Sequence, residues 1–162
     1  MGYYSENGTD YGPNDGGNEV LILAYLLRWS GAVNETDDPY NDSSIRSPYG
    51  LDVVRYVQDV LFVPKRTGPT DNDQIKWALM NYGALYTGIY WDSSYEKGEA
   101  YYYYGTYPYG NHAITIVGWD DTYSANNFKY KPAGDGAFII KNSWGTGYGN
   151  EGYYYVSYYD NV

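Results

Sequence analysis

The chain has no cysteine and a single histidine, His112, among its 162 residues. Without a thiol it can form no disulfide, bind no zinc through thiolates and supply no cysteine nucleophile. One imidazole is also too few for the usual zinc sites. The acidic clusters at 71–73 and 120–121 lack the spaced ligands and the glycine of a calcium-binding EF-hand loop. We therefore expect neither a metal nor any other cofactor.

Basic residues and long apolar runs are scarce as well. The chain has 10 Lys and Arg against 20 Asp and Glu, and its formal net charge is −10. An acidic surface without a basic stripe repels phosphate backbones, so nucleic acid is excluded as a partner. The longest apolar run, residues 20–27, is far too short for a membrane span. Three glycosylation sequons, at Asn7, Asn34 and Asn41, favour an extracellular or cell-surface protein.

Tyrosine is abundant, with 25 residues, and the hydrophobic fraction of 43% is enough for a packed core. Tyrosine combines an apolar ring with a polar hydroxyl, which suits half-wet sheets and grooves better than a dry helical core. The spacing of apolar residues predicts a helix from Asn18 to about Trp29. Acidic residues in the first turn and Gly83 at the end predict a second helix over residues 70–82. Strand patterns occur at 53–63, 84–91, 112–119, 136–142 and 152–159. This order of elements indicates an α+β fold.

His112 heads the stretch NHAITIVGWDD, and Asn142 and Trp144 lie in GAFIIKNSWGTGYGNEGYYYV. If these two strands are neighbours, the Asn142 oxygen can accept the proton of one imidazole nitrogen and leave the other nitrogen free to act. An indole packed over this contact would exclude water and strengthen the hydrogen bond. The alternative is that His112 is an ordinary strand histidine and Asn142 a turn residue.

The runs KNSWGTGYG and NHAITIVGW resemble the asparagine and histidine motifs of papain-like cysteine peptidases. The Gly16-Gly17 turn before an apolar helix resembles the glycine pair with which these enzymes hydrogen-bond an extended peptide, although an ordinary turn would read the same way. The resemblance implies that His112 is the general base and acid and that Asn142 orients its ring.

The same resemblance implies supporting roles at four positions. Trp144 would shield the histidine–asparagine pair, Gly16 and Gly17 would hold the substrate backbone, and Ala113 would line the pocket. The substrate would be a peptide or a protein.

The implied fold is papain-like α+β. Residues 1–50 would be a remnant of the helical left subdomain, and residues 51–162 would be a β-rich right subdomain, an antiparallel sheet or barrel, with His112 and Asn142. The family's cysteine opens a long central helix about 130–150 residues before the histidine and asparagine. We therefore expect that helix to precede this chain. Its absence would leave the apolar surface of the helix at 18–29 uncovered.

Two functions stay open. The chain resembles the C-terminal part of a papain-like cysteine endopeptidase, inactive as given, to which a separate chain or segment would supply the cysteine helix. Alternatively, it is a non-catalytic pseudopeptidase that serves as a peptide- or glycan-binding or structural surface module, with tyrosine clusters at 101–109 and 153–159 as its contact surface. An upstream cysteine in the natural gene product would distinguish the two.

Overall fold

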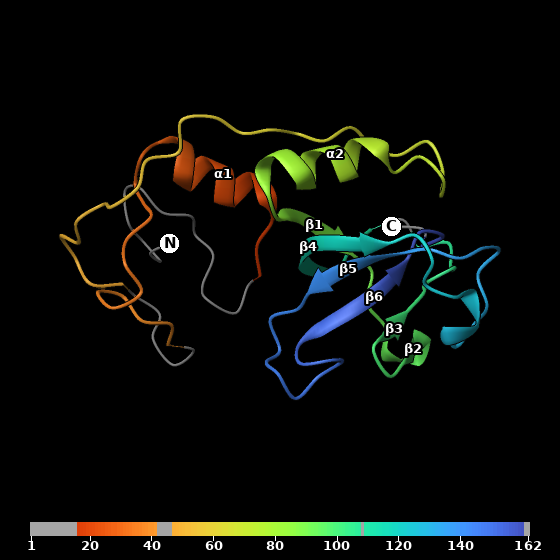
Figure 1. Ribbon diagram of the computed structural model, residues 1–162. Coiled ribbons are helices and arrows are strands. Elements are labelled where there is room, and N and C mark those ends of the chain that lie inside the picture. Colours follow the sequence, from red (N-terminus) through yellow and green to blue (C-terminus); the bar gives the residue numbers. More distant parts are fainter. Residues whose placement is uncertain (1–15, 42–46, 108, 161–162) are drawn as a thin grey trace. The chain divides into compact units, whose positions relative to one another are not determined.

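The computed structural model describes residues 16–41, 47–107 and 109–160 (Figure 1). Contacts divide the chain into two compact units, Met1–Phe62 and Val63–Val162. The subdomain boundary expected from the sequence lies earlier, after residue 50. The assignment of these units to the two papain-like subdomains stays a prediction.

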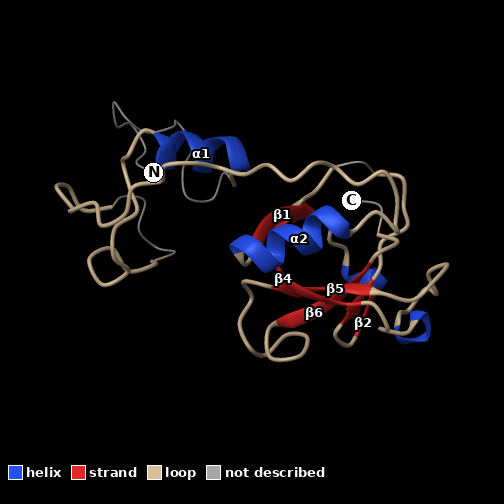
Figure 2. Cartoon of the chain, turned by 45° about the horizontal axis from the view of Figure 1, so that its top comes forward, coloured by secondary structure: helices blue, strands red, loops and turns tan. Residues whose placement is uncertain are grey.

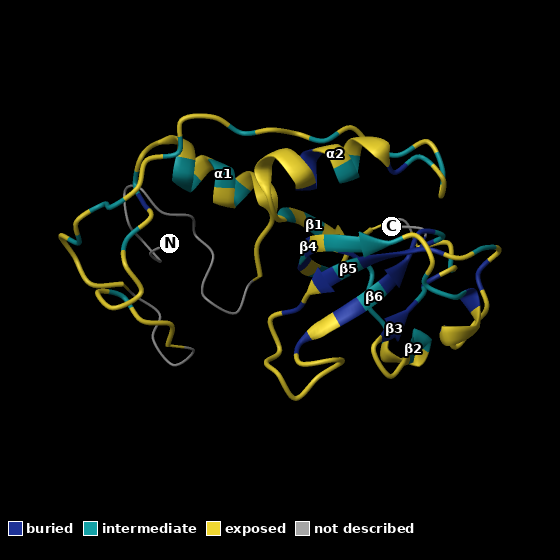
Figure 3. Ribbon diagram, viewed as in Figure 1, coloured by how far each residue is buried: buried dark blue, intermediate teal, exposed yellow. Residues whose placement is uncertain are grey.

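The first unit contains helix α1 (Glu19–Leu27). The side chain of Asn18 caps it by accepting a hydrogen bond from the Leu21 amide at 3.1 Å, which confirms the predicted start. No residue of α1 is buried, and Val20 is 64% exposed (Figure 3). Leu21, Leu23, Tyr25 and Leu26 are half-buried, so the apolar face of α1 is covered only in part. That a separate helix would cover the rest stays a prediction. Of the sequons, Asn7 lies outside the described residues, whereas Asn34 and Asn41 are exposed.

The strand predicted at 53–63 is wrong, because residues 51–66 form neither helix nor strand. The segment is held by single contacts instead. The Val54 amide donates to the Ala32 carbonyl at 2.9 Å, and the Trp29 indole donates to the Val57 carbonyl at 3.1 Å. β-Branched and aromatic residues favour an extended backbone, but a strand also needs a neighbour to complete its hydrogen-bond ladder.

The second unit is a six-stranded sheet in the order β1-β4-β5-β6-β3-β2, and every neighbouring pair is antiparallel except β3 with β6. Its elements are α2 (Asp73–Tyr82), β1 (Leu85–Ile89), η1 (Ser93–Tyr95), β2 (Glu96–Lys97), β3 (Ala100–Tyr101), β4 (His112–Asp120), η2 (Ala125–Asn127), β5 (Ala137–Lys141) and β6 (Tyr153–Ser157). Helix α2 and strands β1, β4, β5 and β6 confirm the predicted elements, and the sheet confirms the α+β class.

Helix α2 and the sheet share one core. Figures 1 and 2 show α2 lying along β1 and β4. Leu79 of α2 packs in the same cluster as Ile89, Ile140 and the fully buried rings of Tyr101 and Tyr154. This core is unusually rich in tyrosine, and each buried hydroxyl needs a hydrogen-bond partner.

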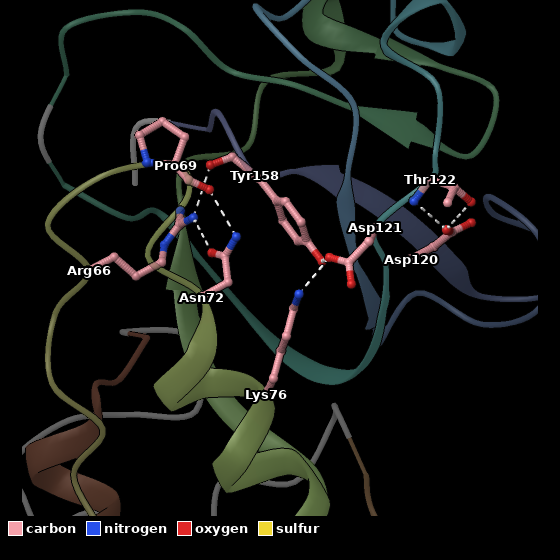
Figure 4. A network of polar contacts seen from close by, with 8 residues as sticks. All are labelled: Arg66, Pro69, Asn72, Lys76, Asp120, Asp121, Thr122 and Tyr158. Atoms are coloured by element: carbon pink, nitrogen blue, oxygen red, sulfur yellow. Dashed lines mark hydrogen bonds and ion pairs between the residues drawn. The ribbon is translucent and has the colours of Figure 1, made fainter.

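The segment before α2 is fastened to the end of β6 by Arg66 (Figure 4). Its Nη1 donates to the Asn72 side-chain oxygen at 3.0 Å and to the Tyr158 carbonyl at 2.9 Å. The Asn72 amide nitrogen in turn donates to the Pro69 carbonyl at 2.9 Å. These contacts fix where the chain turns into α2.

A second polar contact ties α2 to the turn after β4 (Figure 4). Lys76 forms an ion pair with Asp121, and the Tyr158 hydroxyl donates to the same carboxylate at 2.8 Å. Together these two partners hold the pKa of Asp121 below its usual range, with the hydrogen bond from Lys76 as the largest cause.

We expect Asp121→Asn to lower the free energy of unfolding at pH 7 by up to about 1 kcal/mol, because the Asp121 side chain is 58% exposed and water screens the pair. A lowered pKa stabilises the fold above the usual carboxylate value of about 3.9, and this stabilisation is lost as the pH falls through the lowered pKa. Urea unfolding should therefore show a difference between variant and parent at neutral pH that disappears in acid. The matched variant Asp52→Asn, at another exposed carboxylate, should leave the curve unchanged. A constant difference at every pH would contradict this account.

At high pH we expect buried tyrosines to limit stability. Burial raises the pKa of Tyr154 to about 12, and the Glu96 carboxylate, which accepts its hydroxyl at 3.1 Å, adds to this shift. A raised pKa gives stability that is complete below the unfolded value of about 10 and is lost as the pH rises through the folded value. Denaturant unfolding between these two pH values should show a smaller loss for Tyr154→Phe than for the parent. Equal losses would show that Tyr154 has no part in the alkaline transition.

Candidate active site

The pairing of β4 with β5 brings the predicted catalytic residues to one end of the sheet. Thr115 of β4 lies opposite Lys141 of β5 in an antiparallel register. β4 begins at His112, three residues before Thr115, and Asn142 directly follows Lys141, the last residue of β5. The pairing therefore brings the start of β4 close to the end of β5, where His112 and Asn142 lie.

The His112 ring is hydrogen-bonded to Asn142, with 2.9 Å between Nε2 and Oδ1. The Ser143 backbone amide also donates to this oxygen, at 2.7 Å. Since a backbone amide can only donate, that end of the Asn142 side chain must be the oxygen, and Nε2 of His112 must carry the proton. In the neutral ring, Nδ1 is then left as the basic nitrogen.

Asn142 is buried, with 7% of its surface exposed, whereas His112 is half-buried. Among the described residues, the amide nitrogen of Asn142 is buried without a hydrogen-bond partner. Its oxygen thus makes both hydrogen bonds of the side chain, one of them to His112. A buried acceptor holds the imidazole more firmly than one that water can replace.

Trp144 lies against the histidine of the pair. Its indole stacks on the His112 ring, with 4.7 Å between centroids and 23° between planes. Trp144 is itself 39% exposed and contacts Tyr148 edge-on at 5.8 Å. The indole therefore lies on one face of the imidazole, and its role as a shield of the hydrogen bond stays a prediction.

Sequence reasoning missed Trp91, which follows β1. Its indole meets Trp144 edge-on at 5.1 Å and His112 at 6.0 Å. Asn111, also missed, accepts from the Trp91 amide at 2.6 Å and donates to the Trp91 carbonyl at 3.0 Å. The available signals were the position of Asn111 next to His112 and the tryptophan that ends the run ALYTGIYW.

The remaining predicted site residues are placed as follows. Gly16 (φ +76°) and Gly17 precede α1 in the first unit, and a Cβ on either would meet no atom within 4 Å. Ala113 is exposed and pairs with Gly88 of β1. Because strand residues alternate, Ala113 points to the opposite side of β4 from His112. Substrate contacts by these three residues stay predictions.

The described part of the chain contains no group of three or more His, Cys, Asp or Glu side chains that could hold a metal ion. No helix in these ranges is long and apolar enough to cross a membrane. Among the described residues, the site at this end of the sheet consists of the His112 imidazole, the Asn142 amide that orients it, and two neighbouring indoles.

Comparison with known proteins shows the family of the chain. The family model of the papain family cysteine proteases matches residues 5–161. The chain therefore belongs to the papain family, which confirms the resemblance seen in the sequence.

One plant protein and one bacterial protein illustrate the match. Cysteine proteinase 15A of Pisum sativum is 32% identical over 147 residues, which cover 88% of this chain and 38% of the relative. The structure of the clostridial cysteine protease Cwp84 after propeptide cleavage superposes with a TM-score of 0.84 at 32% identity and covers 97% of this chain and 40% of that one. Another structure describes Cwp84 as a surface-layer-associated protein of Clostridium difficile. The chain thus spans about two fifths of the length of these relatives.

The single histidine makes the site directly observable by NMR. For the neutral ring, we expect the imidazole ¹⁵N shifts of the parent to show the proton on Nε2, because Oδ1 of Asn142 can only accept. Asn142→Ala removes this acceptor and should yield a mixture of tautomers. Ser143→Ala keeps the backbone amide and the Asn142 side chain, so it should behave like the parent. A parent ring protonated mainly at Nδ1 would contradict the assigned orientation.

Proposed function

We propose that this chain provides the histidine and the asparagine of a thiol-dependent peptidase site, and that a segment other than these 162 residues provides the cysteine thiolate. The observation that carries the proposal is the hydrogen bond of 2.9 Å between His112 Nε2 and Asn142 Oδ1. It leaves Nδ1 as the nitrogen that can exchange a proton with a nucleophile. Family membership supports the same chemistry.

The reaction would proceed in two stages. The thiolate attacks the carbonyl carbon of the scissile peptide bond while the imidazolium of His112 donates its Nδ1 proton to the departing amine. The C–N bond breaks and a thioester remains. Nδ1 then takes a proton from water as the water oxygen attacks the thioester. The C–S bond breaks, the carboxylic acid leaves, and the pair of thiolate and imidazolium is restored.

The site's other residues would support these steps without exchanging protons. Asn142 holds the ring so that Nδ1 points to the thiolate, and Trp144 excludes water from the contact. In this proposal Gly16 and Gly17 bind the substrate backbone, and Ala113 lines the pocket, as the resemblance implies. Without the cysteine, the 162 residues alone are inactive, because loss of a nucleophile removes most of the rate enhancement.

We also propose that the protein acts outside the cell or on its surface. A clostridial relative is described as surface-layer associated. The exposed sequons at Asn34 and Asn41 agree with such a location. Its substrate would then be a peptide or a protein at the cell surface.

The first test uses protein isolated from its natural source. We expect a mass clearly above the 18.4 kDa of these residues, or a second chain that copurifies. The additional segment or chain should contain a cysteine that a thiol-directed covalent inhibitor labels. In that complete protein, His112→Ala should lower kcat/KM for peptide hydrolysis by about 10³-fold or more. Asn142→Ala should lower it less, and Asn81→Ala, at an exposed position of α2, should leave it unchanged.

If the protein purifies alone at 18.4 kDa and binds no thiol reagent, the peptidase proposal fails. A non-catalytic surface module then becomes the function to examine. The exposed tyrosines of the first predicted cluster, Tyr104, Tyr107 and Tyr109, would supply its contacts with a peptide or a glycan. The other members of the two clusters do not all reach the surface, because Tyr101, Tyr103, Tyr154 and Tyr158 are buried in the core.

A further inference from the structure

The residue that connects the catalytic pair to the core of the sheet is Trp91. It lies between the end of β1 and η1, outside both sequence motifs of the site. Four consecutive polar groups of the backbone around it are bound by only two side chains. Asn111 binds the amide and the carbonyl of Trp91, at 2.6 and 3.0 Å.

Tyr101 binds the two flanking peptide groups. Its hydroxyl donates to the Tyr90 carbonyl at 2.6 Å and accepts from the Asp92 amide at 3.1 Å. The Tyr101 ring is fully buried, and burial raises the pKa of its hydroxyl, so the group stays protonated and keeps donating at physiological pH. Trp91 thus has a fixed backbone although it belongs to no strand.

The indole of Trp91 is held equally firmly from the core side. It stacks on Tyr101, with 4.1 Å between centroids and 11° between planes, and it meets the buried ring of Tyr154 edge-on at 4.9 Å. Aromatic contacts of this kind stabilise a packed arrangement beyond the area that they bury. Both supporting rings are 0% exposed.

On its other side, Trp91 touches the part of the site that is least supported. Trp144 stands in the loop after β5, where residues 143–150 are all exposed. Its contacts with ring systems are those to His112, Tyr148 and Trp91. Tyr148 is 55% exposed and cannot hold the Trp144 indole firmly, and His112 is the residue that Trp144 itself covers. Of the three rings, Trp91 is therefore the one that connects Trp144 to the core.

We propose that Trp91 is a positioning residue, which holds Trp144 over the hydrogen bond between His112 and Asn142 and thereby keeps water from it. The importance of this role for catalysis rests on the proposed function. The contact between Trp91 and Trp144 itself needs only the environment of His112, which is present in this chain. Without Trp91, the Trp144 indole loses its rigid neighbour and the imidazole proton becomes accessible to solvent.

The test measures how fast the His112 Nε2 proton exchanges with water, by NMR on the ¹⁵N-labelled 162-residue chain. Because the chain has one histidine, the signal needs no assignment. We expect Trp91→Ala to accelerate exchange about tenfold or more, which corresponds to about 1.4 kcal/mol in the free energy of opening. Trp91→Phe should restore part of the protection, and Trp77→Ala, at an exposed indole of α2, should have no effect.

A double variant separates positioning from general loosening. If Trp91 acts through Trp144, the pair Trp91→Ala/Trp144→Ala should exchange no faster than Trp144→Ala alone. Additive effects, or an unchanged rate in Trp91→Ala, would overturn the proposal. Should Trp91→Ala fail to fold, Tyr101→Phe keeps the stacked ring but removes both hydrogen bonds to the flanking peptides. It should then accelerate exchange about threefold while the melting temperature shows the chain to be folded.

These outcomes are independent of peptidase activity. A protein without a cysteine partner would refute the proposed function and leave the exchange result intact. Unchanged exchange in Trp91→Ala would refute the positioning role and leave the proposed function intact.

Discussion

The antiparallel register between β4 and β5 is the constraint on which the candidate site depends. A slip of one residue would turn His112 to the opposite face from Asn142, because side chains alternate along a strand. The register is held by buried neighbours, since Ile116 lies opposite Ile140 within the core. The bulge in β4 falls between Ile116 and Gly118, away from the site, so the paired segment next to His112 is regular. Core packing thereby sets the geometry of the candidate site.

The core is built from rings that also fasten loops. The buried hydroxyls of Tyr101, Tyr154 and Tyr158 reach, respectively, two peptide groups beside Trp91, the Glu96 carboxylate and the Asp121 carboxylate. An aliphatic side chain would fill the same volume without making these bonds. The tyrosine content that distinguishes the sequence is therefore a means of attaching irregular segments to a small sheet. At the site, the same means supports an indole next to the histidine.

Much of this arrangement could be predicted from sequence. Apolar spacing identified α1, and an acidic first turn and a terminal glycine identified α2. Strand-like runs identified β1, β4, β5 and β6, with clear alternation only in the last. The contact between His112 and Asn142 and the packing of Trp144 against His112 followed from two motifs of local sequence. The prediction of a strand at 53–63 is wrong, because residue propensity describes a single segment, whereas a strand also needs a neighbouring strand to pair with. Trp91 and Asn111 were missed because their contacts join residues 20 positions apart, outside any periodic element.

The sequence by itself determined the kinds of groups present: one imidazole, no thiol, an acidic surface and rings enough for a sheet. It also determined the family, because the residues around His112 and Asn142 form local motifs. Only the tertiary structure decided which nitrogen of His112 is bonded to Asn142 and which indole supports Trp144. Those choices depend on distances between segments that meet only when the strands pair and the rings pack, and no local pattern encodes such distances.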